Sequence, residues 1–251
     1  MAETKHGRNQ IVSDSEQGDG SNPSENSHQG IGALGNLTPA DRQEEQKRTL
    51  ASPRRHYSLG AKLLFLSLDA IYGKRRTLSK FKVLELVARV PYQSWEQVAY
   101  IAITHVSDRT GMARRIHDRV LEARSQQDNE QWHLLILEEL IESLGIKEDW
   151  IRYSVLPQVI AFAYYQISVL LYVINPSWSY RLNADFECHA EHEYMTLVSE
   201  HPEWEQEPFH SALAKEYGEY ESRADLLRQI GYDERMHKDA SAIRMKEPRF
   251  R

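Results

Sequence analysis

Residues 129–137 read Asn129-Glu-Gln-Trp-His-Leu-Leu-Ile-Leu137, which is a Glu-x-x-His pair inside an apolar run. On a helix, side chains three positions apart share a face, so Glu130 and His133 lie close enough to hold one metal ion. A carboxylate that faces a protein core is costly unless it is paired or binds a metal. This stretch therefore favours an all-helical protein in which one helix carries a ligand pair inward.

The Glu-x-x-His spacing is weak by itself. With 25 Glu and 11 His in 251 residues, chance gives about one match. The chain has five, namely Glu3/His6, Glu25/His28, Glu130/His133, Glu207/His210 and Glu234/His237. The first two fall in a polar N-terminal segment, and the fourth spans Pro208. Only the pairs at Glu130 and Glu234 lie in strongly helical sequence.

Two single glutamates lie in similar apolar company. Glu85 follows Val83 and Leu84, and Glu187 follows Phe186. Each glutamate taken alone fits a solvated helix face. Together, one Glu on each of two helices and one Glu-x-x-His on each of two others form the ligand pattern of a di-iron or di-manganese carboxylate bundle. The separations of 45, 57 and 47 residues between the four glutamates suit bundle helices and their connections.

The residue composition indicates which metals the site could bind and which partners are excluded. Four carboxylates and two imidazoles suit iron or manganese. Cys188 is the only cysteine, which excludes a disulfide framework and a zinc site built from several thiolates. The net charge of −6 argues against nucleic acid as a partner, because phosphate binding needs a basic surface.

Two regions are expected. Residues 1–52 are rich in Ser, Gly, Asn, Gln and Glu, and we predict that they form a disordered polar tail. Residues 53–251 are predicted to form the helical di-iron carboxylate domain. Its all-α architecture would be a ferritin-like four-helix bundle with membrane-facing helices. Six helices are expected, at 59–72, 83–104 with a kink or restart at Pro91, 108–144, 153–180, 181–200 and 211–245 with a break near Gly218.

Two apolar segments raise the question of a membrane. Residues 153–180 contain no Asp, Glu, Lys or Arg, and a helix of about 20 residues can cross a bilayer. Gln158, Gln166 and Pro157 argue instead for a bundle helix that also contacts lipid. Residues 59–72 are followed by Lys74, Arg75 and Arg76, as in helices that lie in a membrane interface. An ordinary amphipathic core helix is the alternative for this segment.

Four segments in order resemble the alternative oxidase family, more closely its plastid terminal oxidase branch. They are residues 84–91 (Leu-Glu-Leu-Val-Ala-Arg-Val-Pro), 129–140, 187–194 (Glu-Cys-His-Ala-Glu-His-Glu-Tyr) and 233–237 (Asp-Glu-Arg-Met-His). The resemblance covers about residues 57–245. Leu86 replaces the family's usual Thr, Cys188 and His189 replace two glutamates of the mitochondrial branch, and Glu193 replaces a small residue near the expected quinol pocket.

The resemblance implies a membrane-associated quinol oxidase that reduces O₂ to water without haem or proton pumping and is insensitive to cyanide. It implies ubiquinol or plastoquinol as the electron donor and suggests a homodimer. By motif, two iron ions would be held by Glu85, Glu130, His133, Glu187, Glu234 and His237, with Glu130 and Glu234 bridging. Tyr194 matches the active-site tyrosine, and Asn129 and Asp233 would orient ligands through hydrogen bonds.

Two other functions fit the same residues. One is a di-iron hydroxylase or oxygenase that acts on a quinone precursor or a fatty chain, and the other is a non-enzymatic, membrane-binding helical bundle. The N-terminal residues 1–19 have no apolar core and carry Glu3, Asp14 and Glu16, unlike a signal or transit peptide. We therefore expect a peripheral, monotopic protein of a bacterial cytoplasmic or photosynthetic membrane.

Overall fold

The chain is described by a computed structural model at residues 33–35 and 37–247. Within these residues there is no strand, so the all-α prediction is confirmed. The α-helices of the described part are α1 (Pro39–Ala51), α2 (Leu59–Tyr72), α3 (Leu78–His105), α4 (Thr110–Ser143), α5 (Leu156–Ile174), α6 (Pro176–Glu200), α7 (Ala214–Tyr217) and α8 (Arg223–Arg244). A π-helical turn, η1 (Ile151–Val155), and a 3₁₀ turn, η2 (Pro202–Gln206), complete the order.

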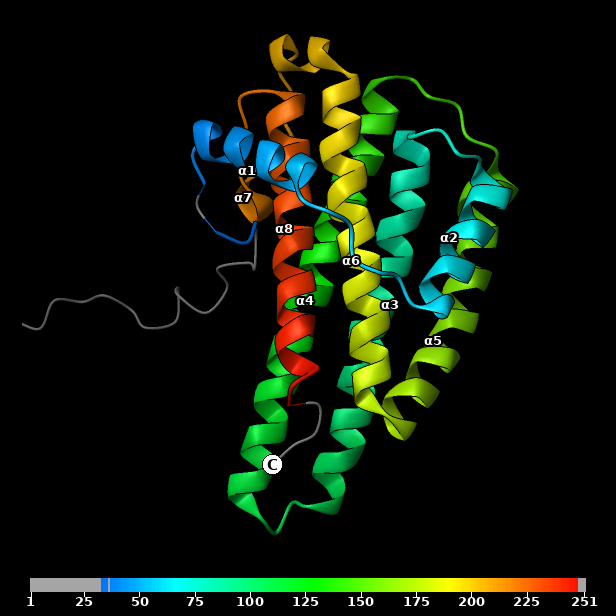
Figure 1. Ribbon diagram of the computed structural model, residues 1–251, viewed down its shortest axis with the longest axis vertical. Coiled ribbons are helices and arrows are strands. Elements are labelled where there is room, and N and C mark those ends of the chain that lie inside the picture. Colours follow the sequence, from blue (N-terminus) through cyan, green and yellow to red (C-terminus); the bar gives the residue numbers. More distant parts are fainter. Residues whose placement is uncertain (1–32, 36, 248–251) are drawn as a thin grey trace, which may run out of the picture.

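Four long helices, α3, α4, α6 and α8, run along the length of the molecule as a bundle (Figure 1). Helix α3 packs on α4, and α6 packs on α8. The main core fills the space between them with buried residues such as Phe81, Val87, Leu137, Leu197 and Leu227. The bundle predicted from the ligand pattern is therefore present, and its four helices are the ones that carry the predicted ligands.

The helix boundaries differ from the expected ones at two places. Helix α3 continues through Pro91 to His105. The charge-free run 153–180 is two helices, because Asn175 caps the start of α6 through its side chain and Pro176 takes the first helical position. The predicted break near Gly218 is present between α7 and α8, and the Gly218 φ of 128° is one that only glycine adopts readily.

Helix α1 lies inside the segment predicted to be disordered, so that prediction is wrong for residues 39–51. Thr38 and Asp41 form a capping box at its start, and Pro39 stands in the first turn. The helix packs on α8 and α6 mainly through buried polar side chains, Arg42, Gln46 and Thr49, which an apolar pattern does not reveal. The predicted disorder of residues 1–32 lies outside the described residues. With α1 and α7, the described helices outnumber the six expected.

Helices α2 and α5 lie on one side of the bundle (Figure 1). The ring of Tyr72, at the end of α2, contacts the ring of Tyr153 in η1, which precedes α5, at a centroid distance of 5.5 Å. Helix α5 packs on α3 and α6 through Tyr164, Ser168 and Tyr172. Of the described helices, Ile151–Ile174 (η1 with α5) is long and apolar enough to cross a membrane, judged by length and composition alone.

Candidate metal centre

The predicted ligands meet in the middle of the bundle. Glu85 comes from α3, Glu130 and His133 from α4, Glu187 from α6, and Glu234 and His237 from α8. All six side chains are buried. Each Glu-x-x-His pair lies on the inward face of its helix, as the spacing predicts.

Their ligand atoms form two overlapping groups. The first group consists of Glu85, Glu130, His133 and Glu234, and the second of Glu130, Glu187, Glu234 and His237. Within each group all the atoms lie within 4.8 Å of one another. Glu130 and Glu234 belong to both groups, so each would be within reach of both metal ions.

The two histidines reach the carboxylates through one ring nitrogen. His133 Nδ1 lies 3.2 Å from Glu85 Oε2 and 3.1 Å from Glu234 Oε1. His237 Nδ1 lies 2.6 Å from Glu130 Oε1. The imidazoles therefore face the same space as the carboxylate oxygens.

Five of the carboxylate oxygens in the cluster lack hydrogen-bond donors among the described residues. Both oxygens of Glu130, both of Glu234 and Oε2 of Glu187 are buried without a hydrogen-bond partner among the described residues. Such unsatisfied acceptors are rare in native cores and costly unless a cation compensates them. Four carboxylates would balance two divalent ions, and the oxygen-rich donor set with two imidazoles suits iron or manganese. The residues present therefore fit a pair of such ions.

The electrostatics of the cluster agree with this fit. Burial, reinforced by the neighbouring carboxylates, raises the pKa of Glu130, Glu187 and Glu234 well above the ordinary glutamate value. Burial lowers the pKa of His237 to about 4. Burial acts in the same sense on His133, but the carboxylates of Asp233 and the neighbouring glutamates outweigh burial and raise its pKa well above normal. Without a metal, the cluster holds protons in its place.

Asp233 is the hydrogen-bond partner of His133, as expected from the motif. Its Oδ2 lies 3.3 Å from His133 Nε2 and accepts from Asn129 Nδ2 at 3.1 Å and from Tyr217 Oη at 2.8 Å. Its Oδ1 accepts from Gln229 Nε2 at 2.8 Å. A carboxylate behind a ligand histidine fixes the orientation of the ring, with the other nitrogen turned to the metal.

Two buried tyrosines contact the cluster. Tyr194 on α6 donates a hydrogen bond from its hydroxyl to Glu85 Oε1. Tyr92 on α3 donates to Glu187 Oε1 at 2.8 Å. Burial first, and the facing glutamates second, raise the pKa of both hydroxyls well above the ordinary tyrosine value, so each holds its proton.

Three residues of the site, Tyr92, Tyr217 and Gln229, were not predicted from the sequence. Tyr92 lies seven positions after Glu85, and Gln229 lies four before Asp233, so helical spacing could have placed both near the site. Nothing in the sequence pointed to Tyr217, whose position depends on the short helix α7. The pair Glu207/His210 lies outside the cluster, and Glu3/His6 and Glu25/His28 lie outside the described residues.

The fold and the site define a helix bundle with a buried cluster of carboxylates and imidazoles, which is the arrangement of di-iron carboxylate proteins. The family model described as alternative oxidase matches residues 54–243. The chain therefore belongs to the alternative oxidase family, and the resemblance inferred from its motifs is confirmed.

Among curated proteins, the chain is similar to ubiquinol oxidase 4, chloroplastic/chromoplastic, of Arabidopsis thaliana. The two are 36% identical over 127 residues, which cover 51% of this chain and 33% of the relative. The match thus spans about a third of the relative's length. Its plastid origin agrees with the branch that the motifs resemble.

Proposed function

We propose that this protein is a membrane-associated quinol oxidase with a di-iron centre. Two quinols would each give up two electrons and two protons. One O₂ would take up these four electrons and four protons to form two waters. The products would be two quinones and two waters, with no oxygen atom transferred to the quinone. Either ubiquinol or plastoquinol is the proposed donor.

The observation that carries the proposal is the pair of overlapping ligand groups that share Glu130 and Glu234. Membership of the alternative oxidase family supports the same function, as does the name of the Arabidopsis relative. When bound, the iron pair would take up the electrons of the quinols and pass them to O₂. Glu130 and Glu234 would help to hold both ions, Glu85 with His133 would help to hold one, and Glu187 with His237 would help to hold the other.

Tyr194 is the proposed redox-active side chain. Its buried hydroxyl donates to Glu85, so its proton has an acceptor within hydrogen-bond reach. It would lend one electron and one proton while the O–O bond is broken, the proton leaving through the Glu85 carboxylate, and a quinol would return both to the tyrosine. Its ring packs on Phe81 at a centroid distance of 4.4 Å, and these apolar surroundings exclude water.

The proposed membrane contact is the outer face of α2 and α5. Leu59, Leu63 and Leu66 are exposed on α2, and Val159, Phe162 and Leu170 on α5. A soluble monomer rarely exposes such a continuous apolar face, and Lys74 and Arg75 beside it suit anionic lipid headgroups. Because the inner face of α5 packs on the bundle, we propose monotopic, interfacial binding rather than a spanning helix. The identity of the membrane, bacterial or photosynthetic, and the homodimer stay predictions.

The test is oxygen uptake by membranes of cells that produce this chain. We expect uptake that depends on added quinol and persists in cyanide, with Glu234→Ala as the inactive control. Isotopically labelled O₂ should leave all its label in water. Label in an organic product would favour the hydroxylase alternative, and absence of quinol-dependent uptake from iron-loaded protein would refute the oxidase.

A further inference from the structure

An N-terminal strap, residues 33–35 and 37–52, lies across α8 (Figure 1). It consists of a short non-helical segment followed by α1. The strap precedes residue 54, where the match to the alternative oxidase family begins. The strap therefore lies outside the matched range, whereas the bundle residues that it contacts lie inside it.

Buried polar contacts anchor α1. The guanidinium of Arg42 binds Asp225 of α8 in a bidentate pair, with Nε–Oδ1 at 2.7 Å and Nη2–Oδ2 at 2.6 Å. Gln46 donates to the Met195 carbonyl of α6 at 2.9 Å and accepts from Arg228 Nε at 2.7 Å. Because these groups are buried, their pairing resists screening by salt and fixes the register of α1 on α8.

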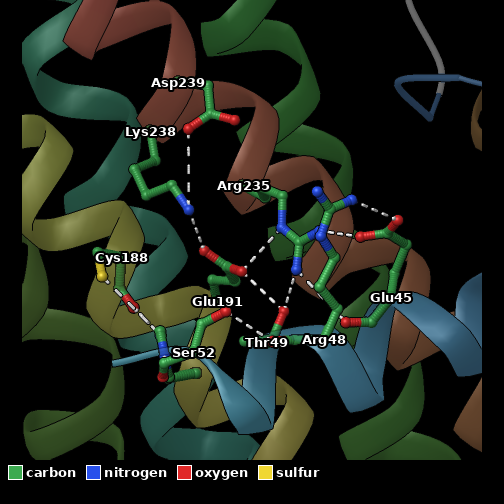
Figure 2. A network of polar contacts seen from close by, with 10 residues as sticks. Glu45, Arg48, Thr49, Ser52, Cys188, Glu191, Arg235, Lys238 and Asp239 are labelled. Carbon is green, nitrogen blue, oxygen red and sulfur yellow. Dashed lines mark hydrogen bonds and ion pairs between the residues drawn. The ribbon is translucent and has the colours of Figure 1, made fainter. Parts of the chain in front are cut away.

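A second anchor lies directly behind the metal centre. Figure 2 shows Arg235, the residue after Glu234, between Glu191 of α6 and Thr49 and Glu45 of α1. Glu191 accepts from Thr49 Oγ1 and from Lys238 Nζ, each at 2.7 Å. The turn of α8 that carries Glu234 and His237 is therefore held on its outer side by the strap.

The segment before α1 contacts the site through Asp233. The Leu34 backbone N–H donates to Asp233 Oδ1 at 3.0 Å. Gln229 Nε2 donates to the same Oδ1 at 2.8 Å and lies 3.4 Å from the Leu34 carbonyl. The Ala33 N–H donates to the carbonyl of Tyr217, whose hydroxyl donates to Asp233 Oδ2. The strap thus supplies one donor to Asp233 and supports two others.

We propose that the N-terminal strap is a positioning part of the metal centre. The Leu34 N–H and the α1 anchors hold Asp233, and through it the His133 ring, in the orientation that binds metal. The inference rests on the proposed di-iron centre. Because His133 belongs to only one of the two ligand groups, loss of the Leu34 donor should act chiefly on one metal ion.

The test is the release of iron from the loaded full-length protein to an excess of chelator, without quinol. Leu34→Pro removes the N–H donor, whereas Leu34→Ala keeps it and serves as the matched control. We expect one of the two irons to leave about tenfold faster from Leu34→Pro, the low end of the effect of losing a hydrogen-bond partner behind a ligand. Leu34→Ala should release both irons at the wild-type rates.

A second pair of variants tests the anchoring of α1 and leaves the Leu34 donor in place. Arg42→Met breaks the buried pair with Asp225, and Lys47→Met alters an exposed residue of the same helix. Arg42→Met should also accelerate the loss of one iron, and Lys47→Met should not. Equal acceleration of both irons would indicate general destabilisation, and wild-type rates in Leu34→Pro and Arg42→Met would equally overturn the proposal. Since no quinol is involved, either result leaves the oxidase proposal standing.

Discussion

Glu234 is shared by both ligand groups, so its removal should affect both metal ions. We predict that Glu234→Ala lowers quinol-dependent oxygen uptake at least 100-fold, since neither ion keeps its full set of ligands. Helix content measured by circular dichroism should stay unchanged, because the substitution also removes a carboxylate with no hydrogen-bond partner from the core. Glu207→Gln, in a Glu-x-x-His pair outside the cluster, is the control. Unchanged uptake in Glu234→Ala would refute the site assignment.

The raised carboxyl pKa values predict the pH dependence of the iron-free protein. A glutamate with a raised folded pKa stabilises the fold less as pH rises from its ordinary 4.5 through the folded value, and Glu130, Glu187 and Glu234 are of this kind. His133, also raised, loses its contribution in the same direction. His237, lowered to about 4, has the opposite sign, but its contribution is complete above its ordinary 6.5.

Iron-free protein should therefore have a lower free energy of unfolding at pH 9 than at pH 7, measured with urea. The decrease should be smaller in iron-free Glu130→Gln, which lacks one of the titrating groups. Bound iron should reduce the decrease, because it keeps the ligands deprotonated. Equal or greater stability of the iron-free protein at pH 9 would show that the cluster does not hold protons as described.

The ligand residues could be predicted because each pairs a charged side chain with an apolar helical context. A glutamate between Leu84 and Leu86 faces an apolar environment, which is unfavourable unless the carboxylate is paired or binds a metal ion. The Glu-x-x-His spacing places Glu130 and His133 on one face of their helix. Tyr217 could not be predicted, because its contact with Asp233 depends on tertiary packing of α7. The strap donor at Leu34 is a backbone group, and a sequence pattern carries no signal for it.

At the scale of helices, α6 and α8 approach each other closely at Gly231. A Cβ built there would lie 3.0 Å from Met195 Cε and 3.1 Å from Tyr194 Cβ. We predict that Gly231→Ala pushes α8 away from α6 and lowers the free energy of unfolding by about 1–3 kcal/mol, despite the better helix propensity of Ala. Thermal or urea unfolding of the iron-free protein measures this.

Gly111→Ala is the matched control for Gly231→Ala. It lies in α4, where the added Cβ meets only Arg115 Nη1 at 3.9 Å. The substitution should leave stability unchanged or raise it by less than about 1 kcal/mol. If both variants were equally stable, the close approach of α6 and α8 would have no energetic consequence.

The long helices could be predicted because the spacing of their apolar residues shows which face of each helix is buried. Helix α2 begins and ends at the expected residues, 59 and 72. Helix α1 was not predicted because it contacts the bundle through ion pairs and hydrogen bonds, and hydrophobic periodicity does not detect such contacts. The capping box at Thr38 and Asp41 was visible in the sequence and could have revealed its start. The boundary between α5 and α6 at Asn175 was missed because the apolar composition continues across it.

For the whole molecule, the exposed face of α2 and α5 predicts membrane binding. Leu63→Glu with Phe162→Glu should weaken binding to vesicles of phosphatidylcholine and phosphatidylglycerol by about tenfold for each residue, since each buried side chain contributes roughly 1.5–3 kcal/mol. Ile243→Glu, an equally exposed apolar site on α8, should bind like the wild type. Equal binding by all three proteins in a flotation assay would rule out this face as the membrane contact.

The central claim is that four helices hold two metal ions through a shared set of buried carboxylates. Its most direct test is the iron content of the full-length protein purified without added metal. The account predicts two irons per chain in the wild type and less than one in Glu130→Gln, because that glutamate belongs to both ligand groups. Iron-free wild-type protein, or two irons retained in Glu130→Gln, would contradict it.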